Sequence, residues 1–103
     1  MPDNQFLCDA SERLTFEMFR VACSDYPAVC ADVIAVFGLQ LHATPVAGLD
    51  QVFGAFGRGE QIVELAWDNW SGFIVTALNT DAEPLVREIG EFLEASPWAS
   101  AGK

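Results

Sequence analysis

Apolar residues near the end of the chain repeat with the period of an α-helix. The spacing places five of them on one helical face: Leu85, Val86, Ile89, Phe92 and Leu93. Thr80 or Asp81 can cap the first turn, and Ser96-Pro97 ends the pattern because the residue before a proline disfavours helical backbone. We therefore predict a helix over about residues 81–95.

A second helical pattern lies between Ser24 and Gly38. Tyr26-Pro27 supplies an early proline, and Gly38 can close the helix as a C-cap. Between them, apolar residues repeat at helical spacing: Val29, Cys30, Val33, Ile34 and Phe37. This segment is predicted to be helical.

Residues 11–23 fit two interpretations. Leu14, Met18 and Val21 suit a helix, whereas the alternation from Leu14 to Met18 suits a strand. We favour a helix because Ser11-Glu12 can begin one and the next element is helical.

Residues 61–78 have the pattern of a β-hairpin. Two segments rich in β-branched and aromatic residues, 61–67 and 73–78, flank the turn formers of Asp68-Asn69-Trp70-Ser71-Gly72. Before the hairpin, 49–56 is either a short helix or an irregular third strand. Phe53 and Phe56 are its expected core anchors.

The two faces of the hairpin differ in polarity. Val63, Leu65 and Trp67 share a face that is plainly core. The opposite face is still mostly apolar, with Ile62, Ala66, Ile74 and Leu78 beside Glu64 and Thr76. A half-exposed sheet is usually more polar, so we expect this face to be covered by another part of this chain or by another chain.

These elements predict a single α+β domain over residues 1–103. N-terminal helices precede a small antiparallel sheet, whose hairpin at about 61–78 leads into the C-terminal helix at about 81–95. The helices are expected to pack on the Val63/Leu65/Trp67 face. The 51% of hydrophobic residues are sufficient for a core and exclude a disordered chain.

The net charge of the chain favours some classes of binding partner over others. Fifteen acidic residues against five basic ones give a formal net charge of −10, and Arg58 is the one basic residue between positions 21 and 86. Such a surface repels nucleic acids and anionic membranes and attracts a basic protein. The alternative is that the charge only keeps the protein soluble.

The cysteines and the N-terminus favour a cytoplasmic location. Cys8, Cys23 and Cys30 form no C-x-x-C pair and are expected to be small buried thiols in a reducing compartment. The first residues show no secretory pattern, and no apolar run approaches the roughly 20 residues that span a bilayer.

Residues for catalysis or cofactor binding are scarce. His42 is the one histidine and has no neighbouring acid to orient it, although a dyad with a cysteine is an alternative. The glycines of 54–59 match no phosphate-binding motif and are interpreted as a turn. Carboxylate pairs such as Glu60/Glu64 fit a solvated acidic face. We predict no catalytic residue, no cofactor and no metal site.

The hairpin turn is the most unusual feature. Two of the three tryptophans flank its polar centre. Trp67 is expected to close the end of the core, while Trp70 either folds over the core or is free to contact a partner. The predicted partner-binding residues are Glu60, Glu64, Asp68, Asn69 and Trp70.

The motif W-D-N-W-S-G-F is followed by a predicted strand and then by the helical pattern from Asp81 to Leu93. Over residues 60–94, this arrangement resembles small acidic bacterial immunity proteins of polymorphic toxin systems. The resemblance implies a non-catalytic inhibitor that places acidic and aromatic groups in the basic cleft of a toxin domain. The alternatives are a structural homodimer that covers the face around Ile62, Ile74 and Leu78, or a small enzyme or ligand-binding domain that uses His42.

Overall fold

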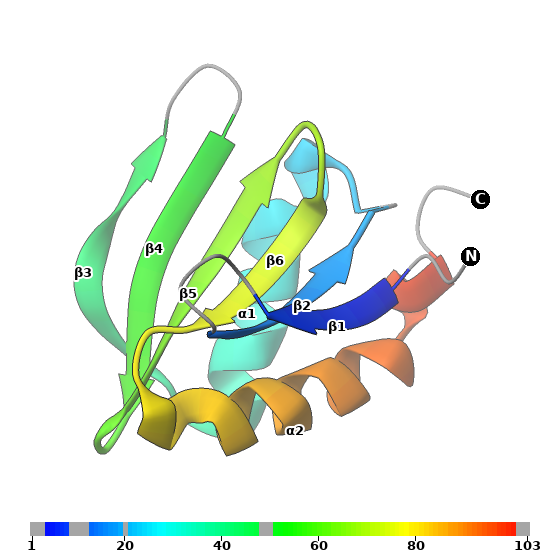
Figure 1. The fold of residues 1–103 in the computed structure, drawn as a ribbon. Helices are drawn as coiled ribbons and strands as arrows, with labels where there is room; N and C mark the ends of the chain where they lie inside the picture. The colour runs from blue at the N-terminus through cyan, green and yellow to red at the C-terminus, as the bar shows by residue number, and fades with distance from the viewer. Residues whose placement is uncertain (1–3, 9–12, 20, 48–50, 101–103) are drawn as a thin grey trace.

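A six-stranded antiparallel sheet and two helices make up the computed structural model, which describes residues 4–8, 13–19, 21–47 and 51–100. The strands are β1 (Asn4–Cys8), β2 (Leu14–Met18), β3 (Gln40–Ala47), β4 (Gln51–Arg58), β5 (Gln61–Asp68) and β6 (Gly72–Ala77). The helices are α1 (Tyr26–Phe37) and α2 (Glu83–Glu94), with short 3-10 turns at Cys23–Asp25, Thr80–Ala82 and Pro97–Ser100. The fold is α+β, as predicted (Figure 1).

The sheet order is β1-β2-β6-β5-β4-β3. Strands β3 to β6 follow one another as a meander, and the N-terminal hairpin β1-β2 adds to the edge of β6. The predicted hairpin at 61–78 is therefore the β5-β6 pair in the middle of the sheet. The C-terminal helix is also confirmed, as α2.

Local sequence signals explain both helices. Pro27 and Pro84 each lie in a first turn, where a missing N–H breaks no helical hydrogen bond. α1 ends at Gly38, whose φ of 65° is favourable for glycine, and α2 ends where the Ser96 hydroxyl donates to the Leu93 carbonyl oxygen at 2.6 Å.

The prediction of a helix in residues 11–23 was wrong over residues 14–18, which form β2. Ser11-Glu12 lies outside the described residues. Phe16 and Met18 are fully buried, and their cross-strand partners on β6 are Val75 and Phe73. Burial against a strand distant in sequence outweighs the local pattern, which fitted a helix as well as a strand. The predicted helical pair at the N-terminal side is therefore one helix, α1, preceded by a hairpin.

Of residues 49–56, left open between helix and strand, positions 51–56 belong to β4, and 49–50 lie outside the described residues. Because side chains alternate along a strand, Phe56 is buried beneath the helices, whereas Phe53 points to the opposite face and is half-buried. The glycines at 54–59 do not make one turn. Gly54 and Gly57 lie within β4, and Gly59 lies in the turn that follows.

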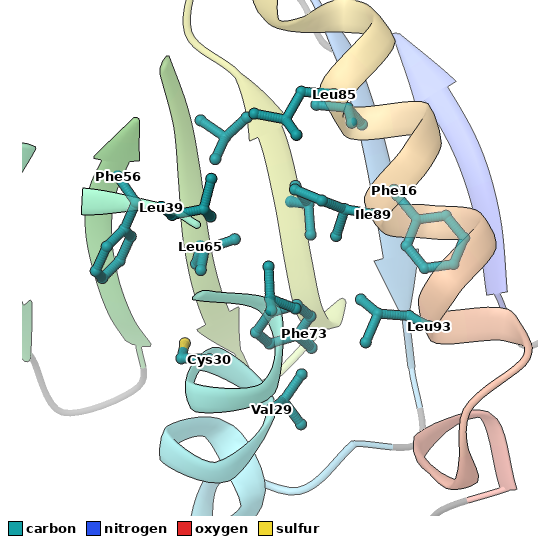
Figure 2. Packing of buried hydrophobic residues seen from close by; sticks show 14 of the residues in the cluster. Phe16, Val29, Cys30, Leu39, Phe56, Leu65, Phe73, Leu85, Ile89 and Leu93 are labelled. Atoms are coloured by element: carbon teal, nitrogen blue, oxygen red, sulfur yellow. The ribbon is translucent and has the colours of Figure 1, made fainter. Parts of the chain in front are cut away.

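Both helices pack on the face of the sheet that carries Val63 and Leu65, as predicted. Figure 2 shows Val29 and Cys30 of α1, and Leu85, Ile89 and Leu93 of α2, directed towards Leu65 and Phe73. The Tyr26 hydroxyl donates to the Leu65 carbonyl oxygen at 2.6 Å, which joins α1 to the centre of the sheet. Trp67 packs at the margin of this core, as expected, and its Nε1 donates to the Val21 carbonyl oxygen at 2.8 Å.

The expectation of buried cysteines holds for Cys30 alone. Cys8 and Cys23 are exposed, and all three are free thiols. None of the helices in the described part of the chain is long and apolar enough to cross a membrane.

α2 approaches the N-terminal hairpin most closely at Gly90. A Cβ placed there would lie 2.5 Å from Phe6 Cζ and 2.9 Å from Phe16 Cδ1, both inside van der Waals contact. The two rings are 4.9 Å apart between centroids and Phe16 is fully buried, so a side chain at position 90 requires the rings or α2 to shift.

We predict that Gly90→Val lowers the free energy of unfolding by about 2–3 kcal/mol because it overpacks this contact. Urea unfolding would measure the loss. The matched control is Glu91→Val, which places the same side chain at the adjacent exposed position and should change stability by less than about 0.5 kcal/mol. Adding Phe6→Ala to Gly90→Val should recover part of the loss, and equal losses in Gly90→Val and the control would contradict the packing argument.

Candidate protein-binding surface

The face of the sheet opposite the helices has a mixed apolar and acidic surface. We call it the open face and define it by nine residues of alternating register on four strands: Thr15, Glu17, Phe53, Ala55, Ile62, Glu64, Ala66, Ile74 and Thr76. No described helix packs on it, since α1 and α2 share the other side. The described helices therefore do not supply the expected cover, although Thr15 and Ala66 on this face are buried and its other residues are half-buried.

Cross-strand pairing arranges the open face in two rows. The first row runs Ala55, Glu64, Thr76 and Thr15; the second runs Phe53, Ala66, Ile74 and Glu17. Each row places one carboxylate among apolar or hydroxyl side chains. A partner that docks here would meet hydrophobic area and negative charge together.

Glu64 lies in the middle of the sheet and is half-buried. Burial raises the pKa of its carboxyl group above the ordinary value of 4.5, because partial loss of solvent disfavours the charged form. No hydrogen bond or ion pair joins the Glu64 carboxylate to another residue in the described segments. Its charge is thus costly in the isolated protein and would be stabilised by a cation brought against it.

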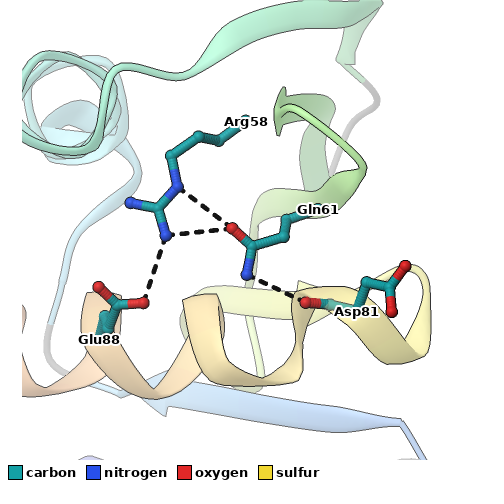
Figure 3. A network of polar contacts seen from close by, with 4 residues as sticks. All are labelled: Arg58, Gln61, Asp81 and Glu88. Atoms are coloured by element: carbon teal, nitrogen blue, oxygen red, sulfur yellow. Dashed lines mark hydrogen bonds and ion pairs between the residues drawn. The ribbon is translucent and has the colours of Figure 1, made fainter.

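Arg58, the one basic residue between positions 21 and 86, faces the helix side. Its guanidinium donates to Gln61 Oε1 at 3.1 and 3.2 Å and to Glu88 Oε2 at 3.3 Å (Figure 3). Gln61 in turn donates to the Asp81 carbonyl oxygen at 3.0 Å, so this network joins the β4-β5 turn to α2 and to the 3-10 turn that precedes it. Arg87 is also on the helix side, with its guanidinium carbon 5.9 Å from the centroid of the Phe6 ring. Neither arginine neutralises the open face.

The β5-β6 turn is built by Asp68. Its Oδ1 accepts the backbone N–H groups of Trp70 at 2.8 Å and Ser71 at 2.6 Å. Gly72 follows with φ 70°, and a Cβ there would collide with the Met18 carbonyl oxygen, so the turn abuts the end of β2. The Asp68 carboxylate therefore positions the turn and is not a free charge.

Two aromatic side chains are exposed at this end of the sheet. Trp70 is 76% exposed and Phe19, which follows β2, is 42% exposed. A Cβ on Gly72 would lie 2.9 Å from the Phe19 carbonyl carbon, which places the Phe19 backbone beside the turn. We call Phe19 and Trp70 the aromatic tip. Trp70 does not fold back over the core, and this leaves its ring available to a partner.

The structure separates the predicted partner-binding residues into three places. Glu64 is central on the open face, while Asp68, Asn69 and Trp70 lie in the turn at one end of β5. Glu60 is exposed in the turn at the other end, where its carbonyl oxygen accepts the Asn79 side-chain amide at 2.7 Å. Since β5 has eight residues, these two turns are roughly 23 Å apart, and Glu60 is not adjacent to the aromatic tip.

Sequence reasoning missed Phe19, Glu17 and Phe53 as surface residues. When residues 11–23 are assigned to a helix, Phe19 is not placed beside the β5-β6 turn. The same assignment hides that Glu17 lies on the same face of the sheet as Ile74. A strand over Leu14-Thr15-Phe16-Glu17-Met18 would have placed Glu17 on the face of the sheet away from the buried Phe16. The alternation of apolar and polar residues in this segment therefore indicated that Glu17 is a surface residue.

The described residues include His42 and three free cysteines, Cys8, Cys23 and Cys30. They contain no group of three His, Cys, Asp or Glu side chains that could hold a metal ion. His42 is exposed and makes no hydrogen bond or ion pair to another described residue. Burial raises the pKa of the Cys30 thiol to about 11, which keeps it protonated and unreactive, and it also raises the pKa of the neighbouring Tyr26 hydroxyl.

The chain matches no protein-family model and shows no significant similarity to a curated protein or to a solved structure. The geometry of the open face and of the aromatic tip is therefore the basis for interpreting its function.

We predict that Glu64→Gln stabilises the protein at neutral pH. The raised pKa means that protonated Glu64 favours folding. Its contribution is fully present below the ordinary value of 4.5 and is lost as the pH rises through the higher folded pKa. Glutamine removes the cost of the charge while keeping the shape, so the variant should have the higher Tm at pH 7, and the gain should vanish at pH values below 4.5.

Thermal unfolding across this pH range measures the difference, with Glu91→Gln on the exposed side of α2 as the control. A Tm difference for Glu64→Gln that does not depend on pH would show that desolvation of the carboxylate is not its cause.

Proposed function

We propose that this protein is a non-catalytic binding module for a basic protein. Its partner docks on the open face and sets a lysine or arginine side chain against Glu64. An immunity-type inhibitor of a basic toxin domain is the specific form that the resemblance over residues 60–94 favours. Residues 60–94 include the β5-β6 hairpin and with it Glu64 and Trp70.

The half-buried Glu64 carboxylate, which forms no hydrogen bond or ion pair with another described residue, is the observation that carries this proposal. A protein whose surface served solubility alone would place its carboxylates in water, as α2 does with Glu88, Glu91 and Glu94. A half-buried charge gains most from a partner cation, because further exclusion of water strengthens their attraction. The apolar neighbours of Glu64 on the open face would exclude that water.

The aromatic tip extends the proposed contact beyond the sheet. Exposed tryptophan is enriched among the residues that dominate interface energies, because one side chain buries a large apolar area with little loss of conformational freedom. The two Asp68 hydrogen bonds hold the turn before a partner arrives. A fixed turn reduces the entropy lost on binding.

The net charge of −10 would act at longer range. It accelerates encounter with a basic protein, and salt screens this effect because the Debye length is about 8 Å at physiological ionic strength. The proposed complex is therefore salt-sensitive. We further propose a cytoplasmic location, which the exposed free thiols of Cys8 and Cys23 support, since oxidising compartments favour disulfides.

The test uses the product of the gene adjacent to the one that encodes this chain. Co-expression should give a complex that weakens with added salt. Glu64→Lys should weaken binding by about 30-fold or more because it sets two cations against each other. Trp70→Ala should weaken it by about 10-fold or more through loss of an anchor. Isothermal titration calorimetry at low and high salt measures both effects.

Glu91→Lys serves as the matched control, because it makes the same charge reversal on the exposed side of α2. A complex weakened equally by Glu64→Lys and Glu91→Lys would reflect net charge and would contradict docking on the open face. If the partner is a toxin, the purified complex should also lack the toxin's activity, and a fully active complex would exclude the inhibitor form.

A further inference from the structure

The open face carries a second carboxylate besides Glu64. Glu17 lies on the same face, on β2, and both side chains are half-buried. The register places Thr76 of β6 between Glu64 and Thr15, and Glu17 is two residues beyond Thr15 along β2. Two strand spacings across the sheet and two residues along it set the Cα atoms of the two glutamates about 12 Å apart. The sheet therefore holds two carboxylates on a diagonal across β5, β6 and β2.

The side chains between these carboxylates are mostly apolar. Ile74 of β6 pairs with Glu17, and Ala66 of β5 pairs with Ile74 on its other side. Ile74 and Thr76 are half-buried, and Ala66 is buried. A segment that reached from Glu64 to Glu17 would cover apolar area at its middle and would meet a carboxylate at each end.

An α-helix is the element of a partner that fits this arrangement. Side chains at positions i and i+7 lie on one side of a helix, and their Cα atoms are about 10.5 Å apart. The long side chains of lysine and arginine can make up the small difference from the spacing of the glutamates. A helix also satisfies its own backbone hydrogen bonds, whereas a single strand laid on the side chains of a sheet would leave its N–H and C=O groups without partners.

The same sheet already holds a helix against these three strands on its other side. α2 contacts β5, β6 and β2, and its Leu85, Ile89 and Leu93 are directed towards the sheet (Figure 2). The 12 residues of α2 are about 18 Å long, which exceeds the diagonal from Glu64 to Glu17. A helix of the same length on the open face would therefore reach both carboxylates.

We propose that the open face recognises an amphipathic helix of its basic partner. Lysine or arginine side chains at i and i+7 of that helix contact Glu64 and Glu17, and apolar side chains at i+3 and i+4 cover Ile74. This inference rests on the proposed function and adds to it the kind of segment that docks. Glu17 already has an interaction within this chain, so it should contribute less affinity than Glu64, because exchanging one polar contact for another gains little.

Three synthetic peptides test the spacing and the helix separately. The first, of about 18 residues so that a helix can form, is rich in alanine and glutamine, with arginines at i and i+7 and leucines at i+3 and i+4. The second has the same composition, but its second arginine is moved to i+9, on the opposite side of the helix. The third is the first peptide with a central proline, which breaks the helix. All three have the same charge, so their general attraction to an acidic protein is equal.

Titration of each peptide into the isotope-labelled protein, followed by two-dimensional NMR up to about 1 mM peptide, measures the affinity and locates the site. The first peptide should shift amide signals of β5, β6 and β2 and should bind at least about 5-fold more tightly than the third. Glu64→Gln should weaken the first peptide about 5-fold and Glu17→Gln about 3-fold. Glu17→Gln should leave the second peptide unchanged, because that peptide cannot reach both carboxylates at once.

Glu91→Gln on the exposed side of α2 is the matched control and should leave the binding of all three peptides unchanged. The spectrum of each variant also establishes that it is folded. Equal binding of the three peptides, abolished by Glu64→Lys but not by Glu91→Lys, would overturn recognition of a helix while supporting the open face as the docking surface. Binding of the first peptide elsewhere, or no binding of any peptide at about 1 mM, would overturn it as well. The proposed function is decided separately, by the complex formed on co-expression.

Discussion

The pairing of β2 with β6 is the constraint on which the rest of this structure depends. It joins the N-terminal hairpin to a meander that begins after α1, and it brings Phe16 and Met18 beside Val75 and Phe73. Those four side chains form part of the floor on which α2 packs. Gly90 then allows α2 to approach Phe6 and Phe16, so the contact of helix and hairpin depends on this register. A slip of one residue would move Phe16 to the open face and Glu17 into the core.

The two sides of the sheet follow from that arrangement. Both helices bury one side, and the side chains there are closely packed and almost entirely apolar. The other side retains Glu17, Glu64 and two threonines among Phe53, Ile62 and Ile74. Such a face costs little stability in water, yet it leaves Glu64 in a poorly solvated place. For the proposed complex, stability of the isolated protein and affinity for the partner's cation would therefore be opposed at this residue, which is common where proteins bind charged partners.

Sequence alone predicted the elements whose signals are local. α2 has a regular apolar stripe, α1 has Pro27 and Gly38 at its ends, and the β5-β6 hairpin has turn formers at 68–72. β2 was missed because its five residues fit both periods, and its pairing with β6 decided between them. β4 remained open because Gly54 and Gly57 weaken a strand pattern, although both glycines pair within the sheet.

The residues of the candidate site also divide into those that local sequence signals identify and those that require the fold. Trp70 and Glu64 were identified from composition and alternation, since an aromatic residue in a polar turn and an acid on an apolar face are visible in the sequence. Phe19 and Phe53 required the fold, because their exposure depends on where β2 ends and on which side β4 presents. Glu60 was grouped with Trp70 by proximity along the chain, and the length of β5 separates them.

The β2-β6 register also sets the order in which this protein can fold during synthesis. Thr15 pairs with Thr76, so the N-terminal hairpin leaves the ribosome long before the strand that will hold it exists. Because the chain is synthesised at about 5–20 residues per second, Phe16 and Met18 have no sheet to cover them for some seconds. A two-stranded hairpin is marginally stable by itself, and the hydrophobic residues of β2 are exposed to other proteins during that interval. The acidic residues between positions 21 and 86 emerge after this hairpin, and like charges on a second copy would oppose its association there.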